Sequence, residues 1–151
     1  MAAPTWTTQI HAAKRFRLGT LKTGVDNGVY MYGAGVASNV AGAWCVFLDA
    51  STWVPTLLAA DTAGPVGISM SANTSATNYS WYQVFGYNII ASSDTTAANK
   101  PLYCDGTAGR VDDATSAGDL VFGAFSTAAD TSNVLPVFIS FPYVTNSAYL
   151  T

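Results

Sequence analysis

Glutamate is absent from this chain of 151 residues, and charged side chains of any kind make up only 10% of it. All nine acidic residues are aspartate. Exposed helices are usually built from Glu, Lys, Arg and Gln, so the chain holds little material for them. The composition excludes a helix bundle, and its many Thr, Ser, Ala and Gly residues favour strands and tight turns.

Groups that titrate or bind metals near neutral pH are also scarce. His11 is the only histidine, and the two cysteines, Cys45 and Cys104, stand in apolar runs without a CxxC or HxxxH spacing. We therefore expect no catalytic residue, no metal site and no cofactor. The thiols are expected to be buried and free, with a disulfide as the alternative.

The few charges are unevenly distributed. The net charge is −3 and the isoelectric point is near 4.6, which argues against a nucleic-acid partner. No apolar run is long enough to span a membrane, and no secretion leader is recognisable, so we expect synthesis in the cytoplasm and no membrane contact. Four of the six basic residues fall within one short stretch, residues 14–22.

Short apolar runs alternate with turn signals along most of the chain, which predicts strands. The expected strands are 29–32, 43–48, 52–54, 65–70, 79–91, 101–104, 120–126 and 135–144, and one helical turn is expected at 56–61. We predict an all-β fold, a single compact antiparallel β-sandwich or small β-barrel with an extended N-terminal arm. Residues 1–23 form the arm and residues 24–151 form the β-domain.

The predicted strand 79–91 is apolar on both faces. Trp81, Phe85 and Tyr87 alternate with Tyr82 and Val84. Such a strand is either central in a closed structure or covered on one face by another protein. We expect most aromatic side chains to fill the core, while the four Trp and eight Tyr leave sugar binding open as a competing interpretation.

A weak internal repeat relates two parts of the chain. A shift of 56 positions aligns residues 46–87 with residues 102–143 and matches residue classes rather than identities. We interpret the two segments as related strand-loop-strand units packed with approximate two-fold symmetry.

One ordered series of segments resembles a known family. Residues 78–86 read NYSWYQVFG, with aromatic residues on both sides of the glutamine. Shorter matching segments lie around it, in order, at 28–32, 53–55, 66–68, 100–103, 109–113, 122–124 and 140–144. The series covers residues 24–145 and resembles the capsid decoration (cement) and head structural proteins of tailed bacteriophages.

That resemblance implies a non-catalytic virion protein that binds the outer surface of the capsid and stabilises the shell. Its expected partners are the major capsid protein and further copies of itself, with a trimer favoured. The alternatives are a carbohydrate-binding, lectin-like head fibre module and a minor tail or adaptor protein. We expect the arm to be flexible, ordering only when bound, and to carry the capsid contacts. The candidate residues are Lys14, Arg15 and Arg17 for electrostatic docking, and Trp6, Ile10 and Phe16 as apolar anchors.

Overall fold

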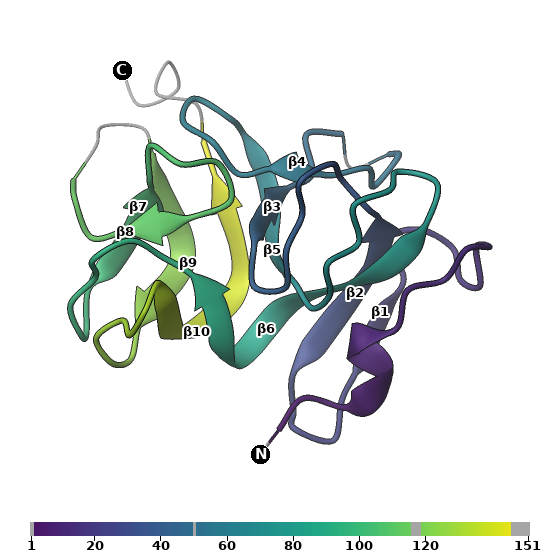
Figure 1. Cartoon of the computed structure of the whole chain (residues 1–151), viewed down its shortest axis with the longest axis horizontal. Helices are drawn as coiled ribbons and strands as arrows, with labels where there is room; N and C mark the ends of the chain where they lie inside the picture. The colour runs from purple at the N-terminus through teal and green to yellow at the C-terminus, as the bar shows by residue number, and fades with distance from the viewer. Residues whose placement is uncertain (1, 50, 116–118, 146–151) are drawn as a thin grey trace.

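The computed structural model describes residues 2–49, 51–115 and 119–145. Within these residues, ten strands join one antiparallel sheet that does not close into a barrel (Figure 1). The elements are η1 (Thr5–Thr8), a 3-10 helix, and strands β1 (Leu21–Thr23), β2 (Val29–Ala34), β3 (Trp44–Val46), β4 (Thr56–Leu57), β5 (Gly64–Ser69), β6 (Tyr79–Ser92), β7 (Pro101–Cys104), β8 (Val111–Asp112), β9 (Leu120–Ser126) and β10 (Val134–Val144). The predicted all-β fold is confirmed. Of the two predicted architectures, the β-sandwich is compatible with this open sheet and the closed β-barrel is not.

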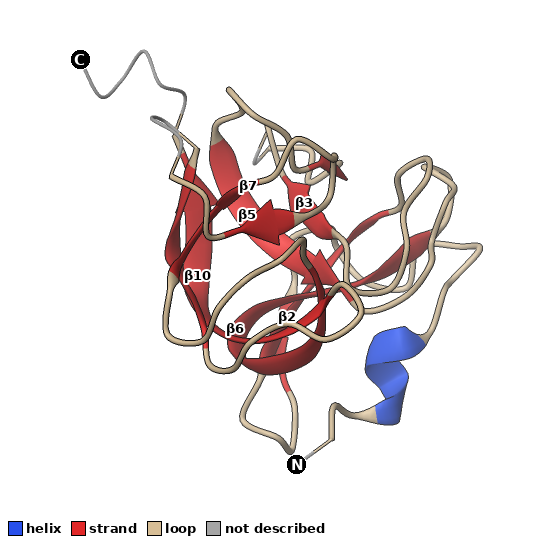
Figure 2. Cartoon of the chain, turned by 60° about the vertical axis from the view of Figure 1, so that its left-hand side comes forward, coloured by secondary structure: helices blue, strands red, loops and turns tan. Residues whose placement is uncertain are grey.

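Strand β6 connects the two halves of the molecule. Its first half pairs with β2, from Ala34 opposite Tyr79 to Val29 opposite Phe85. Its second half pairs with β10, ending with Val134 opposite Ser92. In Figure 1, β6 runs from the side of β1 and β2 to the side of β9 and β10. Strand colouring in Figure 2 shows the sheet curling, with the blue helix beside the strands.

Buried apolar side chains form three clusters. The largest lies among β3, β5 and β7 to β10 and includes Trp44, Leu102 and Ile139. A second cluster surrounds Phe47 and Tyr82. The third contains Tyr30, Tyr32, Met70 and Trp81, with partly buried Trp6, Leu18, Tyr79 and Ile90 packed against it. Neighbouring residues Trp81 and Tyr82 thus enter different clusters, because successive side chains of a strand point to opposite faces.

A buried glutamine supports the middle of β6. The Gln83 amide donates hydrogen bonds to the carbonyl oxygens of Phe85 and Tyr87, both at 3.1 Å. Its own oxygen accepts one from the Asn88 amide at 2.7 Å. Gly86, at φ +108°, allows the backbone to bend around this side chain. Gln83 therefore ties together the backbone of β6 on both sides of Gly86.

The N-terminal segment differs from the predicted arm. Residues 2–23 lie against the β-domain, with Thr7 and His11 buried and Leu21–Thr23 paired to β2 as strand β1. The backbones of His11 and Tyr79 exchange hydrogen bonds of 2.7 and 2.9 Å. A flexible arm that orders only on binding is therefore wrong, because its aromatic side chains cover apolar surface of the same chain.

Two local predictions also fail. Residues 51–53 form a turn in which Trp53 adopts φ +52°, so no strand spans 52–54, and in place of the helical turn expected at 56–61 the chain forms β4, which pairs with β3. Both segments are short apolar runs, and the periodicity of such a run does not distinguish a strand from a turn or a helix.

The segments of the predicted repeat share a pairing scheme. Strand β3 pairs with β4 and β5, and β5 pairs with β6; likewise β7 pairs with β8 and β9, and β9 pairs with β10. Ile68 lies opposite Gln83, and Ala124 opposite Ile139, so both partners are displaced by 56 positions. The repeat stays a prediction, now with a matching strand order.

Replacing Gln83 with leucine tests the buried amide network. The change keeps the side-chain volume but leaves two carbonyl oxygens and the Asn88 amide without their partner, so we expect Gln83→Leu to lower the free energy of unfolding by about 2–4 kcal/mol. The only other glutamine, Gln9, is exposed, and Gln9→Leu is expected to change it by less than about 0.5 kcal/mol. Urea unfolding of both variants provides the measurement, and equal effects would contradict the assigned role.

Candidate functional site

The first turn of the chain places Trp6 on the aromatic cluster of the β-domain. Helix η1 holds Trp6 with its ring edge-on to Tyr30 at 5.4 Å and to Trp81 at 4.9 Å between ring centroids. The Lys22 ammonium lies 4.2 Å from the centroid of the Trp6 ring, a cation–π distance. Trp6 therefore packs on the β-domain of its own chain, and its role as an apolar capsid anchor stays a prediction.

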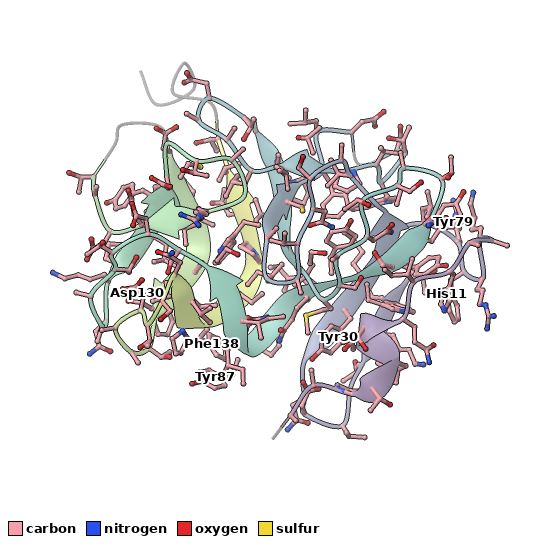
Figure 3. All side chains as sticks on the ribbon, in the orientation of Figure 1. His11, Tyr30, Tyr79, Tyr87, Asp130 and Phe138 are labelled. Atoms are coloured by element: carbon pink, nitrogen blue, oxygen red, sulfur yellow. The ribbon has the colours of Figure 1, made fainter. Side chains whose placement is uncertain are left out.

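A second aromatic contact lies further along the segment. Phe16 packs edge-on to Tyr32 at 5.2 Å and lies 5.3 Å from Trp81, while remaining partly exposed. His11 Nδ1 lies 2.9 Å from the Tyr32 hydroxyl, which also accepts a 3.3 Å hydrogen bond from the Arg15 backbone N–H. Figure 3 shows His11 beside Tyr79 at the end of the molecule away from Asp130.

Four basic side chains surround this aromatic surface. Lys14 lies 5.8 Å from the Tyr79 ring centroid, and Lys14, Arg15, Arg17 and Lys22 are all exposed. Among the described residues, none of the four has a carboxylate partner at ion-pair distance. Beside Arg15 and Lys22, a pocket of about 100 Å³ is lined by Trp6, Gln9, His11, Arg15, Phe16, Lys22 and Trp81. We name the four cations, with exposed Ile10 and Phe16, the cationic platform.

Five of the six predicted site residues thus lie on this platform. The run Lys14, Arg15, Phe16 and Arg17 presents its side chains outward, and Ile10 is exposed beside it. Lys22 was not among the candidates, although its charge was counted in the same basic stretch. Its place over Trp6 depends on the pairing of β1 with β2, which the sequence does not reveal.

The surroundings of His11 favour its neutral form. Burial, and secondarily the positive charge of Arg15, lower its pKa from the ordinary value of 6.5. In the neutral ring, an unprotonated Nδ1 can accept a hydrogen bond from the Tyr32 hydroxyl, whereas a protonated ring could only donate one to it. His11 thus contacts the aromatic cluster through Tyr32 and also lines the pocket of about 100 Å³.

A second uncovered surface lies at the opposite end of β6. Tyr87, Phe138 and Phe125 stand side by side across β6, β10 and β9, since Phe138 is paired with both of the others. Figure 3 labels Tyr87 and Phe138 as neighbours at the lower edge of the view. The rings of Phe85 and Phe138 are 5.6 Å apart, and those of Phe125 and Phe138 are 5.8 Å apart. With Ile89, Phe141 and Tyr143 these residues form what we name the aromatic face.

A bulge in β10 extends this face. Pairing with β9 shifts register between Ile139 and Tyr143, and Phe141 adopts φ +44°. A step of four residues in β10, from Ile139 to Tyr143, spans a step of two residues in β9, and this irregularity leaves Ser140 and Phe141 both exposed and keeps Tyr143 on the outer side, where regular alternation would turn it inward. A bulky residue at positive φ costs about 1–3 kcal/mol, so surrounding contacts must hold Phe141 there.

Groups outside these two surfaces offer little reactive chemistry. Cys45 and Cys104 are free and buried; burial raises the pKa of both thiols, that of Cys104 to about 12. Within the described ranges, no three His, Cys, Asp or Glu side chains gather as a metal site would require. No helix in that part of the chain is both long and apolar enough to cross a membrane.

Comparison with known proteins adds no relative. No family model matches the sequence, and neither a curated protein nor a solved structure is detectably similar to it. Functional inference therefore depends on the two surfaces and on the resemblance described above.

Truncating Trp6 tests whether residues 2–23 belong to the folded unit. Trp6→Ala removes two ring contacts that cover Tyr30 and Trp81, and we expect it to lower the free energy of unfolding by about 2–3 kcal/mol. Ile10 is exposed in the same segment, and Ile10→Ala is expected to change stability by less than about 0.5 kcal/mol. Thermal and urea unfolding compare them; a mobile arm would make both variants neutral.

The lowered pKa of His11 predicts acid sensitivity. Below pH 6.5 the unfolded chain binds a proton at this position that the folded chain resists, so stability falls as the pH is lowered through 6.5. His11→Asn retains a hydrogen-bonding group without this titration. We expect the wild-type free energy of unfolding to fall more than that of His11→Asn between pH 8 and pH 5. Parallel pH profiles would show that His11 is not responsible.

Proposed function

We propose that the protein is a non-catalytic structural component of a tailed-phage head, which binds the outer surface of the capsid and stabilises the shell. The observation that carries the proposal is the cationic platform on an otherwise acidic chain. Outside residues 14–22 the sequence contains nine Asp and two basic residues, Lys100 and Arg110. The resemblance of residues 24–145 to phage head proteins supplies the biological setting.

The platform suits an acidic protein surface. Its four cations have no carboxylate partners among the described residues, so an incoming acidic group would not have to displace an internal ion pair. Lys22 is held over Trp6, and Lys14 near Tyr79, on a folded base. Pre-positioned charges cost less entropy to dock than charges on a mobile arm, and they steer the approach of an acidic partner.

The apolar members of the platform complete the proposed contact. Ile10 and Phe16 are exposed between the basic side chains, and Phe16 is supported from below by Tyr32 and Trp81. An aromatic anchor with a rigid support and a charged rim is the arrangement found at many binding hot spots. On this proposal the acidic partner is the major capsid protein.

The remaining parts of the proposal come from the resemblance. The protein would be made in the host cytoplasm, assemble onto the virion surface as a homo-oligomer, with a trimer favoured, and contact neither nucleic acid nor membrane. It would need no cofactor.

One observation favours the carbohydrate-binding alternative. The pocket of about 100 Å³ combines the aromatic walls Trp6, Phe16 and Trp81 with the polar side chains Gln9 and Arg15. Aromatic walls and a few polar groups also form sugar sites. A glycan array separates the alternatives, since a shell protein should bind capsids and ignore glycans. A minor tail or adaptor protein would instead occur at low copy number in purified particles.

The chain offers a matched test of the platform. Arg15→Gln/Arg17→Gln and Lys100→Gln/Arg110→Gln change the net charge equally, but only the first pair lies on the platform. We expect the first to weaken binding to expanded heads of the encoding phage by about tenfold or more at low salt, and the second to have little effect. Co-sedimentation at several salt concentrations measures this binding.

Similar losses in the two double variants would point to overall charge instead of the platform. No binding by the wild-type chain to heads would overturn the proposed function itself. Circular dichroism of each variant verifies that the β-domain remains folded.

A further inference from the structure

The two ends of β6 are covered differently. Its outer side chains Trp81 and Gln83 are buried, Trp81 beneath Trp6 and Phe16. Farther along β6, a register shift beside Gln83 puts Phe85 on the side of Tyr82, and on that side Tyr87 is 54% exposed and Ile89 is exposed as well. The N-terminal segment covers Trp81 in the first half of β6, while the face that carries Tyr87 and Ile89 in the second half is left exposed.

Exposed apolar groups concentrate on this uncovered half. Among the described residues, thirteen large apolar side chains are exposed, and six of them lie on β6, β9 and β10: Tyr87, Ile89, Phe125, Val134, Phe141 and Tyr143. A contiguous patch of this kind on a protein surface marks a contact with another molecule. The aromatic face is therefore an interaction surface.

The chemistry of the face indicates what covers it. Strands β6, β9 and β10 contain no Asp, Lys, Arg or His. Outside residues 14–22 the chain carries nine Asp against Lys100 and Arg110, so the acidic surfaces of two copies repel one another. An uncharged face is the place where identical acidic chains approach with the least electrostatic cost. It offers no charge with which to select an acidic or a basic partner.

The shape of the face suits a second copy as well. A hollow of about 350 Å³ lies where Phe141 and Tyr143 meet Trp53, Pro65 and Leu21. Another, of about 420 Å³, lies beside Tyr87 and Ile89. Tyr87 and Tyr143 are 56 positions apart, the spacing of the proposed repeat, so an exposed tyrosine adjoins a hollow at each end. A surface that carries both projections and hollows is complementary to itself.

We propose that a second copy of this chain covers the aromatic face, with exposed aromatic side chains of one copy seated in the hollows of the other. This inference does not rest on shell binding, because it uses a different surface. It assigns the unusual backbone of Phe141 a role, since the bulge keeps Phe141 and Tyr143 outward for the contact.

Measuring the molar mass of the wild-type chain tests the inference first. Sedimentation velocity between about 1 and 100 µM should show a species above the monomer mass of 15.7 kDa, growing with concentration. Tyr87→Lys places a charge in the face and should weaken self-association by about tenfold or more. Leu48, also 54% exposed, lies in the loop between β3 and β4, and Leu48→Lys should leave the association unchanged.

A second substitution covers the case in which Tyr87→Lys does not fold. Phe125→Lys alters the face from β9, and melting curves identify which variants are folded. A wild-type chain that stays monomeric at 100 µM, or an oligomer that persists in folded Tyr87→Lys or Phe125→Lys, would overturn the inference. So would a monomer whose binding to heads is lost in Tyr87→Lys, since the shell would then cover the face.

The two proposals fail separately. Arg15→Gln/Arg17→Gln should keep the wild-type mass while losing affinity for heads. Tyr87→Lys should sediment as a lighter species than the wild type, while it still binds heads through the cationic platform.

Discussion

Strand β6 carries large apolar side chains on both of its faces, and covering them constrains the rest of the molecule. Tyr82 and Val84 enter one buried cluster, while Trp81 enters another beneath Trp6. The N-terminal segment folds back because Trp81, Tyr30 and Tyr32 would otherwise face water, and burial of such rings provides a large part of the stability of a small domain. Farther along β6, Ala2, Ala3 and Thr8 of that segment line a hollow beside Tyr87 and Ile89, and these two side chains stay exposed. They belong to the aromatic face.

The same constraint separates the charged surface from the uncharged one. Folding back places Lys14, Arg15, Arg17 and Lys22 around the aromatic cluster at one end of β6. The other end lies among β9 and β10, which have no charged residues. A protein that must meet an acidic surface and also its own copies needs two such regions, because cations favour the first contact and like charges oppose the second. The proposed shell contact and the proposed copy contact therefore use different ends of one strand.

Much of the fold was accessible from the sequence. The segments 65–70, 79–91, 101–104, 120–126 and 135–144 lie within a residue of strands β5, β6, β7, β9 and β10, since apolar runs between turn signals report local structure. Failures occurred where local signals compete, at 52–54 and 56–61, and where the arm was expected to be free. Basic clustering located most of the platform. Its aromatic base was missed, because Trp6 meets Trp81 across 75 positions of sequence, which no local pattern encodes.

Composition and periodicity by themselves determined that this chain is all-β and poor in charge. They also showed that its strands carry more apolar side chains than a sheet with one face toward water would need. Only the tertiary structure decided which of those apolar faces is internal. Regular alternation would place Trp81 and Tyr87 on the same side of β6, but a register shift beside Gln83 puts Tyr87 on the opposite side, and Trp81 is buried whereas Tyr87 is half exposed. Whether a side chain is buried depends on which segment packs against it. Long-range strand pairing and the path of residues 2–23 determine which segment that is.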